Sequence, residues 1–231
     1  MKEYRVIAVD GPAGSGKSTI AGKLAEQIGF VHADSGAIYR TITLALMKKF
    51  GAGNSIEDFQ KTVQNVKEED LKTLAVDIGF ESQKQVNRIA GKDAGEEIRS
   101  PDVTGRIKFI ADTLFCREEV NRLLRKFATY TDIVVDGRDI GSIVFPETPY
   151  KFFLDASIEV RAGRRKKDFI DQGRDISIQE ISEDIRKRDE EDRNRPVGAL
   201  ICPKDAILID TSSMTPENVL GSLMSHMQIH F

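Results

Sequence analysis

The stretch that decides the fold is Val6-Ile7-Ala8-Val9-Asp10-Gly11-Pro12-Ala13-Gly14-Ser15-Gly16-Lys17-Ser18. It opens with a short continuous apolar run, which is typical of a strand buried on both faces of a parallel sheet. A full G-x-x-x-x-G-K-[ST] motif follows, and Ile20, Leu24 and Ile28 then predict an amphipathic helix from Lys17 to Ile28. A strand, a glycine-rich loop and a helix in this order predict a phosphate-binding loop, because backbone N–H groups and the helix N-terminus attract an anion together.

This loop predicts which residues hold a nucleoside triphosphate. Lys17 is expected to reach the β- and γ-phosphates of ATP, and the hydroxyl of Ser18 is expected to bind Mg²⁺. The loop alone does not define the reaction, since GTPases, motor ATPases and small-molecule kinases share it. No N-K-x-D motif is present to read guanine, which counts against a GTPase. The residues expected to bind ATP are Gly11, Pro12, Ala13, Gly14, Ser15, Gly16, Lys17, Ser18, Thr19 and, from a later helix, Arg164.

Apolar runs alternate with helical patterns along the chain, which predicts an α/β fold with a central parallel sheet. The runs Ile133–Gly137, Phe152–Asp155 and Ala206–Asp210 resemble the first strand, and each carries an aspartate at its end. These carboxylates are expected at the carboxyl edge of the sheet, where open α/β sheets bind ligands. Besides the helix after the loop, helices are predicted over Ala37–Lys49, Val103–Phe127, Ile158–Gln172, Ile178–Asp192 and Pro216–Met227.

One region departs from this alternation. Leu74–Phe80, Gln85–Ile89 and Glu96–Ile98 have the pattern of short strands, with turns expected at Gly91 and Gly95. The region therefore predicts a small β insertion in the α/β frame.

The bulk composition predicts a soluble cytoplasmic protein. The formal net charge of the 231 residues is −3, so nothing suggests a nucleic acid or a membrane surface as partner. Cys116 and Cys202 stand far apart, which argues against a disulfide framework or a zinc site. The sequence shows no signal peptide and no apolar stretch near the ~20 residues of a membrane span. Nothing in it requires more than a monomer.

Two further segments predict an acceptor site. Asp34–Arg40 begins a helix, with Ser35 suited to its N-cap and Arg40 about one turn further along. Asp136–Gly141 follows a strand and places Arg138 and Asp139 over the sheet edge. An ordinary capped helix and a structural turn explain these residues almost as well when each segment is taken alone.

A third cluster runs from Arg188 to Arg195, and its residues Arg188, Asp192 and Arg195 share one helix face. Such a run is most often a solvated, salt-bridged surface. Phosphoryl transfer needs positive charge around the transferring group, and mobile arginines that close over ATP would supply it. The arginines of the preceding helix that support this interpretation are Arg161, Arg164 and Arg165.

Taken together, these segments resemble the bacterial cytidylate kinases, in the nucleoside monophosphate kinase group of P-loop NTPases. The resemblance runs nearly end to end and is most specific in D-S-G-A-I-Y-R at 34–40, D-G-R-D-I-G at 136–141 and R-D-x-x-D-R-N-R at 188–195. It implies a three-layer P-loop fold whose core spans 1–60 and 101–231, with a helical lid at about 161–195. The β insertion at about 61–100 would be the domain that binds the acceptor nucleotide.

The resemblance also implies roles for single residues. Ser35, Arg40 and Arg138 would hold the acceptor phosphate, and Asp139 would accept a hydrogen bond from the cytosine amino group. Arg117 would donate to the base edge, while Lys108 stands where the family usually has a serine that touches the base. The expected substrate-binding residues are Ser35, Tyr39, Arg40, Arg117, Arg138, Asp139, Arg188 and Asp192. The expected catalytic residues are Lys17, Arg138, Arg188 and Arg195.

The expected reaction is in-line transfer of the γ-phosphate of ATP to CMP or dCMP, with Mg²⁺ and without a covalent intermediate. Two other functions stay open at this point. One is a P-loop kinase that acts on UMP, AMP or a non-nucleotide acceptor. The other is a non-catalytic module that senses ATP and signals through a partner.

Overall fold

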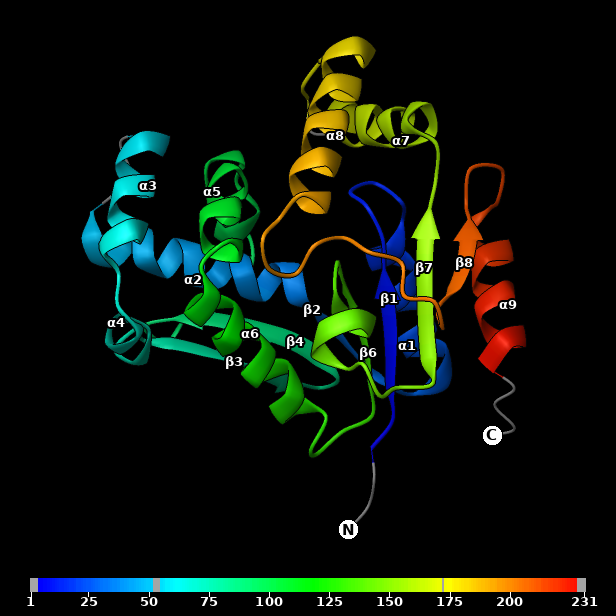
Figure 1. The fold of residues 1–231 in the computed structure, drawn as a ribbon, viewed down its shortest axis with the longest axis horizontal. Coiled ribbons are helices and arrows are strands. Elements are labelled where there is room, and N and C mark those ends of the chain that lie inside the picture. Colours follow the sequence, from blue (N-terminus) through cyan, green and yellow to red (C-terminus); the bar gives the residue numbers. More distant parts are fainter. Residues whose placement is uncertain (1–3, 52–54, 172, 228–231) are drawn as a thin grey trace.

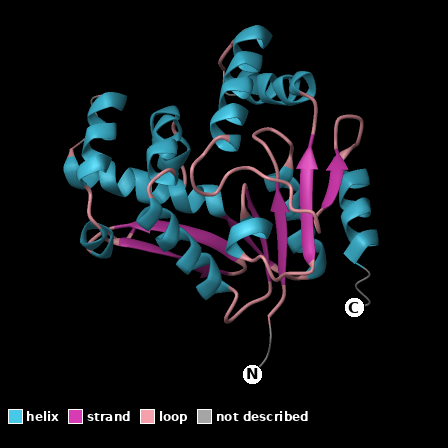
Figure 2. Ribbon diagram, viewed as in Figure 1, coloured by secondary structure: helices cyan, strands magenta, loops and turns pink. Residues whose placement is uncertain are grey.

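A parallel sheet forms the centre of the molecule (Figures 1 and 2). The computed structural model describes residues 4–51, 55–171 and 173–227. The order of the five strands is β2-β6-β1-β7-β8, and every neighbouring pair is parallel. The strands are β1 (Val6–Asp10), β2 (Val31–Asp34), β6 (Ile133–Gly137), β7 (Tyr150–Asp155) and β8 (Ile207–Asp210). The predicted α/β class and its parallel sheet are therefore confirmed.

The two faces of the sheet bury alternate side chains of the strands, as the two-residue period of a strand requires. Ile7 and Val9 pack against α1 (Lys17–Ile28) and α9 (Pro216–Met227) on one face. Ala8 points to the other face, which is covered by α2 (Ser35–Phe50), α5 (Pro101–Ala111) and α6 (Leu114–Phe127). Burial of a side chain such as Ile7 contributes about 1.5–3 kcal/mol. Helices on both faces of the sheet confirm the three-layer architecture.

The strands end at one edge, where their aspartates gather. Asp34 of β2 is paired in register with Asp136 of β6, and Asp155 of β7 with Asp210 of β8. Above this edge lie α7 (Ile158–Asp171) and α8 (Ile178–Arg193), in the region predicted as a lid (Figure 1). The prediction that carboxylates line the carboxyl edge of the sheet is confirmed.

A separate antiparallel sheet confirms the β character of the insertion. It consists of β3 (Val76–Glu81), β4 (Lys84–Ile89) and β5 (Lys92–Asp93), and the helices α3 (Ile56–Asn65) and α4 (Glu68–Lys72) precede it. The turn at Gly91 is present, with the backbone at φ +76°. The strand predicted over Glu96–Ile98 is wrong, because Glu97–Arg99 is a 3₁₀ turn. Amides in this turn donate to nearby carbonyl groups, as that of Ile98 does to Ala94 at 3.0 Å. These amides are therefore not available for hydrogen bonds to a neighbouring strand.

The single helix predicted over Val103–Phe127 is also wrong. The chain leaves the helical conformation at Thr113, whose φ and ψ are −94° and 116°, so that α5 and α6 are two helices. The amide of Asp112 caps α5 by donating to the carbonyl of Lys108 at 2.9 Å. The other predicted helices agree with the structure within about two residues, and Gln172 lies outside the described residues.

The described part of the chain contains no helix with the length and apolar character that crossing a membrane requires.

Candidate active site

The loop between β1 and α1 has the shape that the motif predicts. Gly11, Gly14 and Gly16 all have positive φ, at +148°, +80° and +89°. A Cβ on Gly11 would lie 2.1 Å from the carbonyl oxygen of Leu154 in β7, so only glycine fits there. Gly16 is the N-cap of α1 and has no capping side chain. The first amides of α1 are therefore available to an anion.

Lys17 lies buried in the first turn of α1, and its Nζ donates to the carbonyl oxygen of Pro12 at 3.1 Å. Burial, together with the charge of Arg138, lowers the pKa of Lys17 to about 7. A polyphosphate in the loop would supply negative charge next to this amino group and favour its protonated form.

Ser18 is exposed at the start of α1, and its hydroxyl donates to Oδ1 of Asp136 at 3.4 Å. The same carboxylate contacts Nε2 of His32 at 2.8 Å. Burial raises the pKa of Asp136, but the hydrogen bond and charge of His32 and the charge of Lys17 outweigh it and hold the pKa below its usual range. Neither Asp136, the partner of Ser18, nor His32, the partner of Asp136, is among the site residues predicted from the sequence. An apolar strand that ends in Asp136 was the available signal, and His32 gave none.

The start of α2 forms the predicted acceptor side. Asp34, and not Ser35 as predicted, is the N-cap, since its side chain accepts from the amide of Ala37 at 2.8 Å. Ser35 is the first helical residue, and its hydroxyl donates to the carbonyl oxygen of Asp136 at 2.6 Å. Arg40 lies one turn further along and donates to Asp34 at 2.9 Å. The structure thus brings Ser35 and Arg40 together at one helix end.

Gln85 of β4 supports this helix end and was not predicted. Its side-chain amide accepts from the backbone N–H of Asp34 at 2.8 Å and donates to the carbonyl of the same residue at 3.3 Å. It also donates to Asn87 at 3.0 Å. Because β2 is an edge strand, this amide completes its outer edge as a neighbouring strand would. The insertion is thereby connected to the residue that caps α2.

Arg117 of α6 and Asp139, the two residues expected to read the base, form a buried ion pair with side chains 3% and 7% exposed. Arg117 also donates to the carbonyl oxygen of Ala111 at 2.9 Å and lies 5.8 Å from the centre of the Tyr39 ring. Burial raises the pKa of Asp139, against the opposing charge of Arg117. Both groups are therefore held next to each other in a dry environment.

Asp10 fixes the chain immediately after Asp139. Its carboxylate accepts from the amides of Ile140 and Gly141 at 2.9 and 2.7 Å, at the start of a single π-helical turn. Burial raises the pKa of Asp10 to about 6. The end of β1 and the segment carrying Arg138 and Asp139 are thus held together.

The end of α8 contributes a chain of charges. Asp192 accepts from Arg138 at 2.7 Å and from Arg195 at 2.9 Å, and Arg195 also donates to Asp112 at 2.8 Å. The side chain of Arg188, inside α8, makes no hydrogen bond or ion pair with any residue that the structure describes. Burial and the charges of two neighbouring arginines lower its pKa, so an added phosphate would relieve repulsion there.

Two arginines of α7, Arg161 and Arg164, hydrogen-bond to the phosphate-binding loop. Arg161 is buried in a bidentate ion pair with Asp189, at 3.0 and 2.6 Å, and also donates to the carbonyl of Ala13 at 3.1 Å. Arg164 donates to the carbonyl of Ser15 at 3.3 Å and to the carbonyl of Thr211 at 2.7 Å. Both side chains therefore hold the phosphate-binding loop by donating hydrogen bonds to its carbonyl oxygens.

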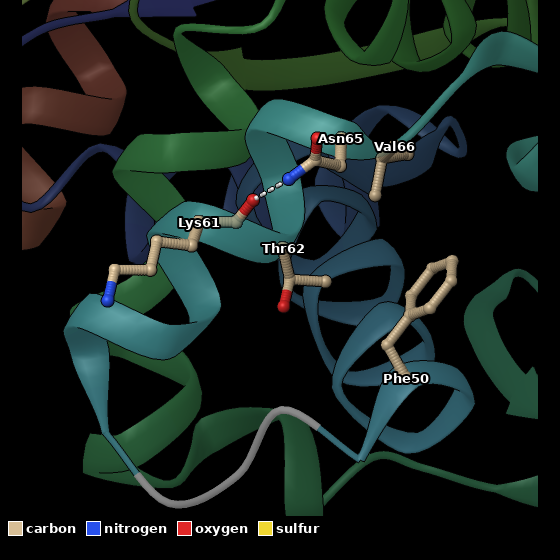
Figure 3. Close-up of a pocket in the computed structure, with 5 residues that line it drawn as sticks. All are labelled: Phe50, Lys61, Thr62, Asn65 and Val66. Atoms are coloured by element: carbon tan, nitrogen blue, oxygen red, sulfur yellow. Dashed lines mark hydrogen bonds between the residues drawn. The ribbon is translucent and has the colours of Figure 1, made fainter.

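Two cavities in the described part of the chain lie next to α3. One, of about 450 Å³, is lined by residues of α3, α5 and the end of α8, among them Lys108, Asp112 and Arg195. The other, of about 330 Å³, contains none of the predicted site residues. It is lined by Phe50, Lys61, Thr62, Asn65 and Val66 (Figure 3).

Comparison with known proteins identifies the family. The sequence profile of the cytidylate kinases matches residues 7–229. The chain belongs to the cytidylate kinase family. It is 39% identical to a cytidylate kinase of Caldanaerobacter subterraneus subsp. tengcongensis over 93% of this chain and 90% of that protein. It is 38% identical to a cytidylate kinase of Desulforamulus reducens, over 97% of both chains.

Among solved structures, the chain is similar to a gluconokinase from Sinorhizobium meliloti 1021, with 14% identity and a TM-score of 0.41 over 97% of this chain and 92% of that one. Membership in the cytidylate kinase family confirms the resemblance found in the sequence, and with it a kinase that uses ATP and a small nucleotide. The roles of the individual site residues stay predictions.

Proposed function

We propose that this cytidylate kinase transfers the γ-phosphate of ATP to CMP or dCMP, giving ADP and CDP or dCDP. One observation carries the proposal. Asp136 contacts the phosphate-binding loop through Ser18 and the acceptor helix through Ser35. The triphosphate loop and the predicted acceptor-phosphate site therefore meet at one residue, as a direct transfer between two bound phosphates requires.

On the donor side, the amides of Gly14–Gly16 and the amino group of Lys17 hold the β- and γ-phosphates. The hydroxyl of Ser18 and the carboxylate of Asp136 form an oxygen donor set that fits Mg²⁺. No group of three or more His, Cys, Asp or Glu residues suited to a metal occurs in the described part of the chain. This agrees with an ion held largely by phosphate and water, as is usual for Mg²⁺. Bound there, Mg²⁺ would neutralise charge on the phosphates.

On the acceptor side, Ser35, Arg40 and Arg138 hold the phosphate of CMP. An oxygen of this phosphate attacks the γ-phosphorus in line, the bond to the β-phosphate oxygen breaks, and ADP leaves. A phosphate oxygen is already ionised at neutral pH, so no side chain has to remove a proton. Arg188 and Arg195 add positive charge around the transferring group, and this electrostatic effect is the main source of rate enhancement.

Asp139 and Arg117 select the base. A carboxylate accepts from the amino group of cytosine, whereas the carbonyl oxygen of uracil would face it as a second acceptor and leave both unpaired. The burial of this pair strengthens the discrimination, since water cannot satisfy a mismatched group.

The test is ADP release with ATP and Mg²⁺ against CMP, dCMP, UMP, AMP, GMP and no acceptor. The expected result is strong turnover with CMP and dCMP, weak turnover with UMP, and almost none without acceptor. Preferred turnover of another acceptor would contradict the assignment of Asp139 and Arg117. If no acceptor increases ADP release, the remaining interpretation is a non-catalytic module that senses ATP.

We further propose a monomer that acts in the cytoplasm. Neither cysteine forms a disulfide: Cys116 is buried and Cys202 is exposed with a free thiol, as in a reducing compartment. Gel filtration with light scattering measures the mass, and a dimer would contradict the first part.

A further inference from the structure

Charged side chains join α5 to the end of α8 in a complementary order. Nζ of Lys108 lies 3.3 Å from Oε1 of Glu191, and Nε of Arg195 lies 2.8 Å from Oδ1 of Asp112. On each segment the two charges are four residues apart and opposite in sign. A slip of four residues would place Lys108 against Arg195. The pattern therefore specifies one register between the two segments, as like charges in contact destabilise.

Within the residues that the structure describes, the lid helices and α5 belong to separate apolar clusters. The lid helices have their own small apolar cluster of Ala162, Ile181 and Ile185, which is separate from the cluster that contains Val103 and Ile110 of α5. The cavity of about 450 Å³ lies between them and is lined by all four charged residues. Two ion pairs, whose four residues line this cavity, thus join α5 and its cap to the end of α8.

This contact is linked to the acceptor site. Arg195, which binds Asp112 of the α5 cap, also binds Asp192, and Asp192 binds Arg138. The ion pair of Lys108 and Glu191 lies next to that of Arg195 and Asp112 and joins the same two segments. The amino group of Lys108 is directed to Glu191 of the lid helix.

We propose that Lys108 and Glu191 are positioning residues for the acceptor nucleotide. Their ion pair holds the end of α8 against α5, which sets Asp192 and Arg195 over the acceptor site. The proposal rests on the proposed function in that Asp192 is taken as an acceptor contact and Arg195 as a charge near the transferring group. The pair does not touch the ATP loop, which Arg161 and Arg164 brace independently.

The test compares wild-type protein with Lys108→Ser in steady-state kinetics. The two side chains are 40% and 38% exposed, so the pair has the weak energy of a surface ion pair, 0.2–1 kcal/mol. The KM for CMP should therefore rise about 1.4- to 5-fold, with the KM for ATP unchanged. The difference should shrink at about 0.5 M salt, where surface charges are screened.

A charge exchange separates positioning from a general structural effect. Lys108→Glu should raise the KM for CMP more than Lys108→Ser, because the new carboxylate faces Glu191. The double variant Lys108→Glu with Glu191→Lys should recover most of the loss. Lys23→Ser is the matched control, since it removes an ion pair of 3.1 Å to Glu217 that joins α1 and α9. This control should leave the KM for CMP unchanged.

Two results would overturn the proposal. In one, Lys108→Ser leaves the KM for CMP unchanged although wild-type protein phosphorylates CMP; the positioning role is then wrong while the proposed function stands. In the other, the exchanged double variant is no better than Lys108→Glu, which would mean that Lys108 acts by another contact. Wild-type protein that does not phosphorylate CMP would instead reject the proposed function together with the inference.

Discussion

The buried pair of Arg117 and Asp139 supports a sharp prediction for the variant Asp139→Asn. The substitution keeps the shape of the side chain and removes its charge. Arg117, whose side chain is 3% exposed, is then left with a buried charge and no counterion. Breaking a buried pair in this way costs about 3–5 kcal/mol, whereas an exposed pair contributes about 0–1 kcal/mol. Urea unfolding should therefore show a loss of roughly 3–5 kcal/mol, a large part of a typical stability of 5–15 kcal/mol.

The same substitution should also change the choice of base. The carboxylate accepts from the amino group of cytosine, while an asparagine amide can equally donate to the carbonyl oxygen of uracil. A hydrogen bond to a charged group contributes about 1.5–3 kcal/mol. The ratio of kcat/KM for CMP to that for UMP should thus fall by about 10- to 150-fold.

Two measurements check this reasoning against a control. Glu119→Gln removes the exposed ion pair with Arg122, whose side chain is 60% exposed, and should cost less than about 1 kcal/mol with no change in base preference. An unchanged ratio of CMP to UMP in Asp139→Asn would refute the role of Asp139 in reading the base. An unfolding free energy equal to that of the control would refute the argument from burial.

Three further predictions address the loop, the insertion and the lid. Because phosphate favours protonated Lys17, whose pKa in the free protein is about 7, the ATP dissociation constant should rise by up to about tenfold per pH unit above pH 7. Calorimetry should show this rise for wild type and a flat profile for the always charged variant Lys17→Arg. Gln85→Ala should raise the KM for CMP about 3- to 10-fold and leave that for ATP unchanged, since two hydrogen bonds to Asp34 are lost; equal effects on both would contradict it. Arg161→Met should cost about 3–5 kcal/mol in urea unfolding by leaving Asp189 buried without its partner, and a loss below about 1 kcal/mol would disprove that burial argument.

Local patterns predicted most of the core and failed where partners outside the pattern decide the conformation. The loop at Gly11–Ser18 was predicted correctly because glycine spacing, strand and helix are contiguous in the chain. Ile98 is apolar and follows two predicted strands, yet its amide donates to the carbonyl of Ala94 and it lies in a 3₁₀ turn. The break at Thr113 has no proline or glycine to mark it, so a continuous helix was the expected result.

In the candidate site too, local patterns identified several residues but not the partners that these residues contact. Arg117 and Asp139 were named as base contacts, but nothing in the sequence showed that they are buried against each other. Arg161 was named for its charge, but nothing in the sequence showed that it pairs with Asp189. His32 was not singled out at all, because a lone histidine on a short strand carries no pattern.

The amino-acid sequence by itself determined the phosphate-binding loop, the alternation of strands and helices, and the carboxylates at the sheet edge. These features follow from backbone sterics and side-chain periodicity within a few residues of each other. Only the tertiary structure decided which cation meets which carboxylate. Arg138 and Asp192 are 54 residues apart, and Arg195 and Asp112 are 83 apart. Such pairs form because the packed sheet and helices bring their ends together, and no local preference of either residue specifies the partner.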